Sequence, residues 1–314
     1  MFRALGVIVA GITLGACTGA AALEDAHIAR LEISHGKPFV MVTVNGKGPF
    51  RFIVDTGTGG EAFITPSLAD QLDLPHVGQM RLSDPSGKGG RSVPIVLLES
   101  LKLAGVDFKG VKAAVHELGD GDGRCQGLLG FVLFRDYLLT LDYPNHQLRL
   151  ASGELTPDGE QSVLPFRMPD KIPVVSLLVG GARVEAQIDS GGAGLSLPEE
   201  LASRMRFSAD PASFSSAHSL STRFEVKGAT LSADIQLGAY TFKNPFVEIN
   251  PAFPLANFGS CPMEHFATTF DQKKMLIRFD ARHQTLRLSA TPAPMRPVNA
   301  PQETPPDHTL VPVG

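Results

Sequence analysis

The sequence predicts an all-β protein with two lobes that repeat one structural unit around a central cleft. Short runs of β-forming apolar residues alternate with turn residues, and the chain has 32 Gly and 24 Pro, which is typical of turn-rich β structure. The stretch FIVDTGTG at residues 52–59 has a counterpart, AQIDSGGAG, at residues 186–194. In both copies an apolar strand ends on an acid, a hydroxyl residue and a glycine. Such self-similarity indicates one supersecondary unit used twice.

The two copies also share their flanking sequence. An apolar run at residues 38–44 precedes the hairpin signal Asn45-Gly46, and an apolar run at residues 172–179 precedes Gly180 and Gly181. The run before Asn45 ends 11 positions before Asp55, and the second run ends 10 positions before Asp189. Downstream, Pro66 and Pro198 each stand where a short helix would begin. Similarity over this length makes a chance match of two tripeptides implausible.

Residues 1–25 have the pattern of a targeting segment and are excluded from the predicted fold. Arg3 is followed by an apolar stretch at residues 5–14, which is too short to span a membrane as a stable helix. The stretch LGAC at residues 14–17 resembles the lipobox of bacterial lipoproteins, in which Cys17 would be acylated and become the mature N-terminus. The alternative is ordinary signal cleavage near residues 20–22. Both interpretations export the protein, and the first anchors it to a membrane in the periplasm.

Export leaves Cys125 and Cys261 as a candidate disulfide between the lobes. Each lies close to the glycine-marked segment of its own half, at Gly130 or Gly259. The alternative is two separate buried thiols, and the sequence leaves both open.

The remaining chain divides by composition. Two apolar runs at residues 93–103 and 108–115 predict strands, and the polar, Gly-rich segment 82–91 before them is either a mobile hairpin tip over the cleft or a plain surface loop. The Ser- and Ala-rich segment 208–222 is expected to be its flexible counterpart. The predicted division is residues 1–25 for signal and tether, 26–151 for the first lobe, 152–160 for a linker, 161–290 for the second lobe and 291–314 for a disordered, Pro-rich tail.

Two alignments of the lobe ends compete. Gly130 precedes Asp142 by 12 positions, and Gly259 precedes Asp271 by 12 positions. The rival alignment matches residues 142–150 with 280–288, because both end in Leu-Arg-Leu. The sequence does not decide between these registers.

Matching turns of a duplicated unit imply a pseudo-twofold axis that brings Asp55 and Asp189 together. Two adjacent carboxylates cannot both ionise easily, so one keeps a proton while the other is charged. Such a pair can activate a water with its charged member and protonate a carbonyl oxygen with its neutral member. The chemistry predicted is hydrolysis of an amide without a metal, a cofactor or a covalent intermediate.

The pattern resembles the pepsin-like and retropepsin-like aspartic proteases, over roughly residues 26–289. The two Asp-hydroxyl-Gly turns and the apolar segments that end at Gly130 and Gly259 carry the resemblance. It implies a bilobal acid-protease fold with two retropepsin-like β-barrel lobes in one chain, a peptide or protein substrate and an aspartic endopeptidase activity. The resemblance implies Asp55 and Asp189 as the catalytic dyad, supported by Thr56, Gly57, Thr58, Ser190 and Gly191. The hydroxyls of Thr56 and Ser190 are expected to cross-link the turns.

The sequence departs from the family pattern at two points. Gly192 stands where the first motif has Thr58, and no Tyr lies between Gly57 and Leu101 to match the flap tyrosine of pepsins. These departures favour a rival interpretation, a peptide-binding lipoprotein of the same fold that has lost turnover. Nucleic acid is not an expected partner, because the formal net charge is −4. We expect a monomer that contacts a membrane only through its lipid.

Overall fold

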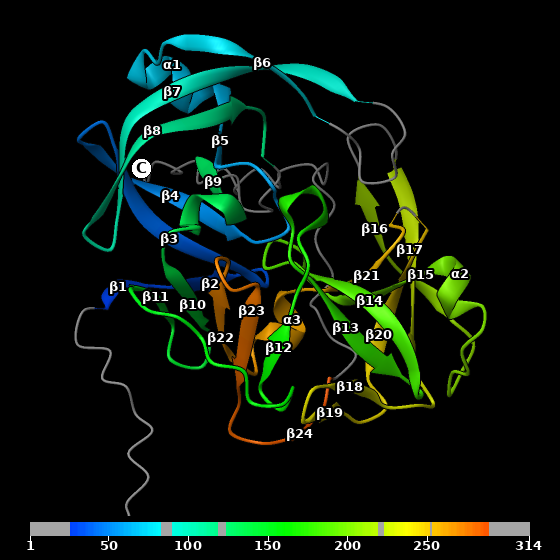
Figure 1. The fold of residues 1–314 in the computed structure, drawn as a ribbon. Helices are drawn as coiled ribbons and strands as arrows, with labels where there is room; N and C mark the ends of the chain where they lie inside the picture. The colour runs from blue at the N-terminus through cyan, green and yellow to red at the C-terminus, as the bar shows by residue number, and fades with distance from the viewer. Residues whose placement is uncertain (1–25, 83–89, 119–123, 219–222, 252, 289–314) are drawn as a thin grey trace, which may run out of the picture.

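The computed structural model describes residues 26–82, 90–118, 124–218, 223–251 and 253–288 (Figure 1). These residues form mostly β-strands and a few short helices, so the predicted all-β class is confirmed. Two lobes built on barrel-like sheets lie beside each other, one from residues 37–115 in blue and cyan and one from residues 174–250 in green and yellow (Figure 1). No helix within the described ranges is long and apolar enough to cross a membrane.

The described part of the first half folds into an eight-stranded sheet. Its order is β2 (Glu32–Ser34), β3 (Lys37–Val44), β4 (Lys47–Asp55), β9 (Gly127–Gly130), β5 (Ala62–Ile64), β8 (Val106–Val115), β7 (Arg91–Leu103) and β6 (His76–Leu82). Strand β3 pairs with both β4 and β7, which closes the sheet into a barrel.

The second half repeats this plan in a ten-stranded sheet. Its order is β16 (Ala212–His218), β17 (Arg223–Thr230), β20 (Phe246–Asn250), β15 (Leu195–Pro198), β21 (Ala256–Phe258), β14 (Ala182–Ile188), β13 (Val174–Val179), β18 (Ile235–Leu237), β19 (Tyr240–Phe242) and β24 (Thr285–Leu286). The helical segments are α1 (Pro66–Leu72), α2 (Glu199–Ala202), α3 (Ser260–Met263) and the 3-10 helices η1 (Phe131–Phe134) and η2 (Pro169–Lys171).

Local sequence signals account for the turns and helix starts. Asn45 and Gly46 join β3 to β4 with φ angles of 49° and 74°, the left-handed conformation that a tight hairpin needs at both central positions. The side chain of Thr65 accepts a hydrogen bond from the Leu68 amide, and Pro66 occupies the first turn of α1. The predicted hairpin and the predicted helix start are therefore confirmed.

The same strand arrangement places both Asp turns. In the first lobe β4 runs parallel to β9, so that Asp55 lies opposite Gly130, and β9 pairs antiparallel with β5. In the second lobe β14 runs parallel to β21, and β21 pairs antiparallel with β15. Each acid therefore leaves a strand that is flanked on both sides, with backbone hydrogen bonds that hold the turn in place.

A third sheet joins the lobes. Its six strands are β1 (His27–Arg30), β11 (Gln147–Ala151), β10 (Leu138–Asp142), β22 (Ala267–Asp271), β23 (Leu276–Asp280) and β12 (Val163–Pro165). Its central pair, β10 and β22, is symmetric about Thr140 and Thr269, whose hydroxyl oxygens are 2.9 Å apart. This symmetry makes Asp142 the equivalent of Asp271, so the alignment with 12 positions in each half is confirmed and its rival is wrong.

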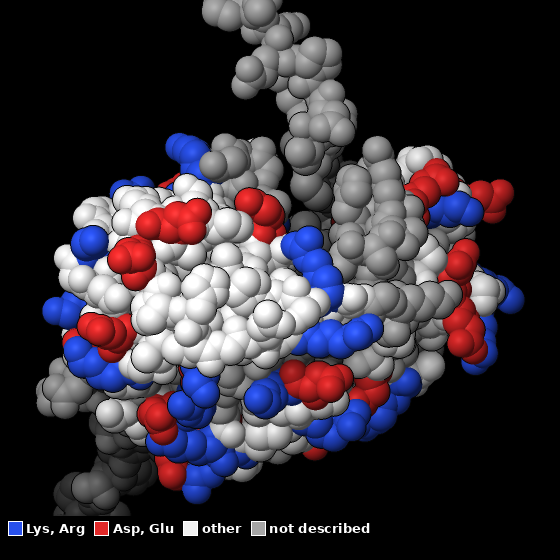
Figure 2. Space-filling view, turned by 90° about the horizontal axis from the view of Figure 1, so that it is seen from above, with Lys and Arg blue, Asp and Glu red and all other residues white. Residues whose placement is uncertain are grey.

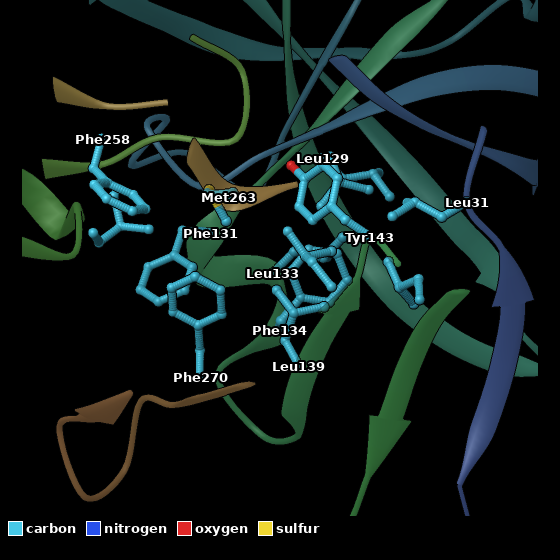
Figure 3. Close-up of a cluster of buried hydrophobic side chains, with 14 of the residues drawn as sticks. Leu31, Leu129, Phe131, Leu133, Phe134, Leu139, Tyr143, Phe258, Met263 and Phe270 are labelled. Carbon is cyan, nitrogen blue, oxygen red and sulfur yellow. The ribbon is translucent and has the colours of Figure 1, made fainter. Parts of the chain in front are cut away.

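The core is continuous across the lobes. One cluster of buried apolar side chains draws residues from both halves. Figure 3 shows Phe131 of the first half facing Phe270 of the second, with ring centroids 5.1 Å apart. Phe258 and Met263 belong to the same cluster and are fully buried. Burial of this apolar surface ties the two lobes together beneath the Asp turns.

One expected loop is a strand. Residues 212–218 of the Ser- and Ala-rich segment form β16, which pairs with β17 as β6 pairs with β7. The expectation of a flexible segment is wrong there, because pairing with β17 overrides a composition that is poor in β-formers. The predicted signal at residues 1–25, the tail at 291–314 and the loop tip at 83–89 lie outside the described residues.

Candidate active site

The two Asp turns meet face to face. Asp55 ends β4, and Asp189 follows β14 directly. A Cβ atom on Gly57 would collide with the carboxyl group of Asp189, and one on Gly191 would collide with that of Asp55. Each glycine thus lies against the opposite acid, and the absence of a side chain is what lets the carboxyl groups approach. The structure brings together the acids that the duplication singled out.

Hydroxyl groups cross-link the turns. The Thr56 hydroxyl donates to the Ile188 carbonyl at 2.7 Å and accepts from the Ser190 amide at 3.0 Å. The Ser190 hydroxyl donates to the Val54 carbonyl at 2.7 Å and accepts from the Thr56 amide at 3.0 Å. Both side chains are fully buried. These reciprocal bonds fix the distance and orientation of the two turns, as the sequence predicted for Thr56 and Ser190.

Hydrogen bonds from the turns orient each carboxyl group. In Asp55, Oδ1 accepts from the Gly57 amide at 2.8 Å and Oδ2 accepts from the Thr58 hydroxyl at 2.9 Å. In Asp189, Oδ1 accepts from the amides of Gly191 and Gly192 at 3.0 and 2.9 Å. Both acids therefore present a fixed pair of oxygens to the same space.

The electrostatics favour one shared proton. Burial, and next to it the charge of Asp189, raise the pKa of Asp55 to about 7 from its ordinary 3.8. The Thr58 hydroxyl and the positive charge of Lys37 oppose this rise without cancelling it. At neutral and acid pH the pair therefore holds a proton that isolated aspartates would lose. One carboxylate and one neutral carboxyl group then stand side by side.

Gly192 marks the point at which the halves differ. The Phe131 amide donates to the Thr58 carbonyl, and the Ser260 amide donates to the Gly192 carbonyl, so Gly192 is the structural equivalent of Thr58. A Cβ atom on Gly192 would lie 2.5 Å from Nδ2 of Asn257 and 2.6 Å from Oδ2 of Asp189. The amide of Asn257 thus occupies the space where Thr58 stands in the first lobe.

Asn257 is a site residue that the sequence analysis missed. It is 7% exposed, and its Oδ1 is buried without a hydrogen-bond partner among the described residues. Its equivalent in the first lobe is Leu128, because Asn257 pairs with Ser196 as Leu128 pairs with Phe63. A polar residue inside an otherwise apolar segment was the available signal. A buried amide with an unsatisfied oxygen costs free energy, which favours a role at the site over a role in packing.

A cavity of about 850 Å³ opens beside the first Asp turn. Gly59 and Gly60, next to the turn, lie on its wall, and Met168 and Lys171 reach it from the second half of the chain. The other lining residues are Glu61, Ala62, Phe63, Met80, Ile95, Gly110, Lys112, Ala114, Val132, Arg135, Asp136, Gln272 and Lys273. A space of this volume, formed by both halves and beginning at the end of the first Asp turn, suits an extended chain such as a peptide.

The candidate disulfide between Cys125 and Cys261 is not formed. The structure holds two separate thiols. Cys125 precedes β9 and is buried with Phe39 and Ile53, whereas Cys261 lies on α3, after the opposite end of the equivalent strand. The two cysteines flank equivalent strands, but Cys125 precedes β9 whereas Cys261 follows β21, so equivalence of the strands does not bring the thiols together. Cys17, the predicted lipid site, lies outside the described residues, which also contain no group of three or more His, Cys, Asp or Glu arranged for a metal.

Comparison with known protein families agrees with this geometry over part of the chain. Curated proteins give no match to the sequence. Residues 40–133 match the model of a family described as aspartyl protease. The matched stretch contains the first Asp turn and the Gly130 segment, and the second Asp turn lies beyond it. The first lobe is therefore similar to an aspartyl protease domain, which supports a protease in general terms.

Proposed function

We propose that the protein is an aspartic endopeptidase that hydrolyses peptide bonds with water activated between Asp55 and Asp189. The observation that carries this proposal is the facing pair of carboxyl groups, in which the pKa of Asp55 is raised to about 7. A single buried acid on a turn would need no such partner. The match of residues 40–133 to an aspartyl protease family supports the same conclusion.

The chemistry proposed needs only the two acids and a water. The carboxylate of the pair removes a proton from the water, whose oxygen adds to the carbonyl carbon of the peptide. The neutral carboxyl group donates its proton to the carbonyl oxygen, so that a neutral tetrahedral diol forms. Proton transfer to the amide nitrogen then allows the C–N bond to break and yields an acid and an amine. Thr58, Gly57 and the backbone at Gly191 hold the carboxyl oxygens in place throughout.

Replacement of either acid tests this function. Asp55→Asn and Asp189→Asn should each abolish cleavage of a diverse peptide mixture, because each removes half of the proton-sharing pair. Mass spectrometry of the peptides measures the cleavage. The double variant should be no less active than the singles, since residues that act as one unit are not additive. Asp70→Asn, on the exposed face of α1, is the matched control and should cleave as the parent does. Near-full hydrolysis by Asp189→Asn would show that the second turn is only structural.

The rival function is a peptide-binding protein of the same fold without turnover. The observation in its favour is Gly192, which leaves Oδ2 of Asp189 without the hydroxyl donor that Thr58 gives Asp55. It predicts no cleavage by the parent and a peptide affinity that survives in Asp55→Asn. The same peptide mixture therefore separates the two functions.

The proposed localisation rests on the N-terminal sequence alone. We propose export to the periplasm and a lipid on Cys17, with the protein acting as a monomer on peptide or protein substrates. A water, one carboxylate and one neutral carboxyl group supply the proposed chemistry, so it involves neither a metal nor a cofactor.

A further inference from the structure

Strand pairing assigns each cleft residue of the first lobe an equivalent in the second. Phe63 lies between Leu128 and Ala114, and Ser196 lies between Asn257 and Glu248. Glu248 is therefore the equivalent of Ala114. Because Ile95 pairs with Ala114 and Gly228 pairs with Glu248, Gly228 is the equivalent of Ile95.

These positions are apolar in the first lobe. Phe63, Met80, Ile95 and Ala114 line the cavity beside Gly59 and Gly60. Phe63, Met80 and Ala114 also form a small cluster with Leu82 and Val93, separate from the main core. Figure 2 shows that residues other than Lys, Arg, Asp and Glu cover much of the face over the first lobe, with charged side chains of both signs at its border. The first-lobe side of the cleft is thus suited to an apolar side chain.

The second lobe places a carboxylate at the equivalent position. Glu248 is half-buried, and a Cβ atom on Gly194, close to the second Asp turn, would collide with its carboxyl group. Burial raises the pKa of Glu248, and no described residue gives it a hydrogen bond or an opposite charge. The ionisable groups that interact with Cys261 in this region are Glu248 and Glu264, which are both acidic. A partly buried carboxylate without a cation carries a desolvation cost that a bound cation would offset.

Aromatic rings stand beside this carboxylate. Phe246 is two positions from Glu248 on β20 and shares its face of the sheet. The rings of Phe246 and Phe214 are 4.9 Å apart, and a Cβ atom on Gly228, the pairing partner of Glu248, would collide with the Phe246 ring. Rings next to an acid suit Lys and Arg, whose methylene groups pack on apolar surface while their charged ends reach a carboxylate.

We propose that, in the endopeptidase proposed above, Glu248 selects a Lys or Arg side chain on one side of the scissile bond. The apolar residues Phe63, Met80 and Ile95, which line the first-lobe part of the cavity, select an apolar side chain on the other side. The pseudo-twofold axis passes between Asp55 and Asp189. A peptide that crosses this axis contacts one lobe on one side of the scissile bond and the equivalent positions of the other lobe on the other side. The substrates are thus peptides in which a basic and an apolar residue flank the cleaved bond.

Mapping of cleavage sites tests this specificity. The parent should cut a proteome-derived peptide library at bonds with Lys or Arg enriched at one fixed position, and Leu, Phe or Met enriched across the bond. Glu248→Gln, which removes the charge and keeps the shape, should lose the basic enrichment. Its kcat/KM on a basic substrate should fall about tenfold or more, as expected for loss of a charge-assisted hydrogen bond. On a matched substrate with Gln in place of the basic residue, kcat/KM should stay unchanged. Glu225→Gln, exposed on β17 of the same sheet, is the control and should keep the parent's preference.

A second variant tests the role of Glu248 if Glu248→Gln does not fold. Glu248→Ala introduces the residue found at the equivalent position of the first lobe and should shift the preference from basic to apolar. Parent cleavage without basic enrichment, or enrichment that persists in either Glu248 variant, would overturn the specificity proposed.

Failure of the proposed function gives a different result. If the parent cleaves no peptide, the same library is tested for retention on immobilised protein. Basic peptides that the parent retains and Glu248→Gln releases would support the role of Glu248 while refuting the endopeptidase. Equal retention by both would refute the role of Glu248 as well.

Discussion

At the scale of single residues, Asp55 differs most from an ordinary aspartate. Its carboxyl group is partly buried at the end of β4, and Asp189 faces it across the two glycines. Both effects disfavour its charged form, so the folded protein holds a proton that the unfolded chain releases above pH 4. The proposed catalytic role of Asp55 and a reduced stability at neutral pH thus have the same physical origin.

Thermal denaturation across pH should reveal this proton. The pKa of Asp55 is about 7 in the folded protein and near 3.8 when unfolded. The stabilisation from this group is therefore fully present below about pH 4 and is lost as pH rises through about 7. As pH rises through this window, the parent should lose unfolding free energy relative to Asp55→Asn. The loss should be at most about 1.4 kcal/mol per pH unit. Melting curves at pH 4, 5.5 and 7.5 measure it, and a constant difference would contradict a shared proton.

At the scale of elements, the two turns form one unit. The hydroxyls of Thr56 and Ser190 make four buried hydrogen bonds across the pseudo-twofold axis, each with a backbone group of the opposite lobe. The strands β4 and β14 cannot shift independently, because movement of either strand breaks bonds to the other. The placement of the acids is thus a property of both lobes together.

Removal of a cross-linking hydroxyl should cost stability and activity together. Thr56→Ala leaves the buried Ile188 carbonyl and Ser190 amide without hydrogen-bond partners. Each such group should lower the unfolding free energy by roughly 1–3 kcal/mol. Ser190→Ala should behave alike. Thr58→Ala is the matched control, because its hydroxyl bonds only a carboxyl oxygen at the cleft and its loss should lower activity more than stability. Chemical denaturation with a peptide-cleavage assay measures both, and a Thr56→Ala variant as stable as Thr58→Ala would refute the cross-link.

At the scale of the whole molecule, the lobes share a sheet and a core. Strands β10 and β22 pair across the lobe boundary, β12 adds to β23, and Phe131 packs on Phe270. Separation of the lobes would therefore expose apolar surface and leave backbone groups of the central pair without partners. The chain around Gly159 is exposed, so this contact does not depend on an intact peptide at that point.

A cut in the linker should leave the protein assembled. A protease site inserted at Gly159, an exposed glycine with φ of 77°, would allow the chain to be cleaved between the lobes. The halves should co-elute in gel filtration and separate only in denaturant, because the shared sheet and core hold them. An uncut sample of the same variant is the control. Two separate peaks without denaturant would show that the linker, and not the sheet, holds the lobes together.

The sequence alone determined the two Asp turns, because their signal is local. An apolar strand, an acid, a hydroxyl and a glycine within a few residues define a turn, and its second copy implied the axis that relates Asp55 to Asp189. The roles of Thr56 and Ser190 came with the same motif through its family resemblance. The hairpin at Asn45-Gly46 and the helix start at Pro66 were equally predictable, since each depends on the conformational preferences of one or two residues.

The tertiary structure alone decided which distant residues surround these turns. Glu248 and Asn257 lie 59 and 68 residues beyond Asp189 in the chain and reach the site through the registers of β20 and β21, which no local pattern specifies. The alignment of Asp142 with Asp271 and the separation of Cys125 from Cys261 were decided in the same way. A shift of one residue in strand pairing moves a side chain to the opposite face of a sheet, so register determines what lines the cleft. Register, in turn, results from packing of the whole core.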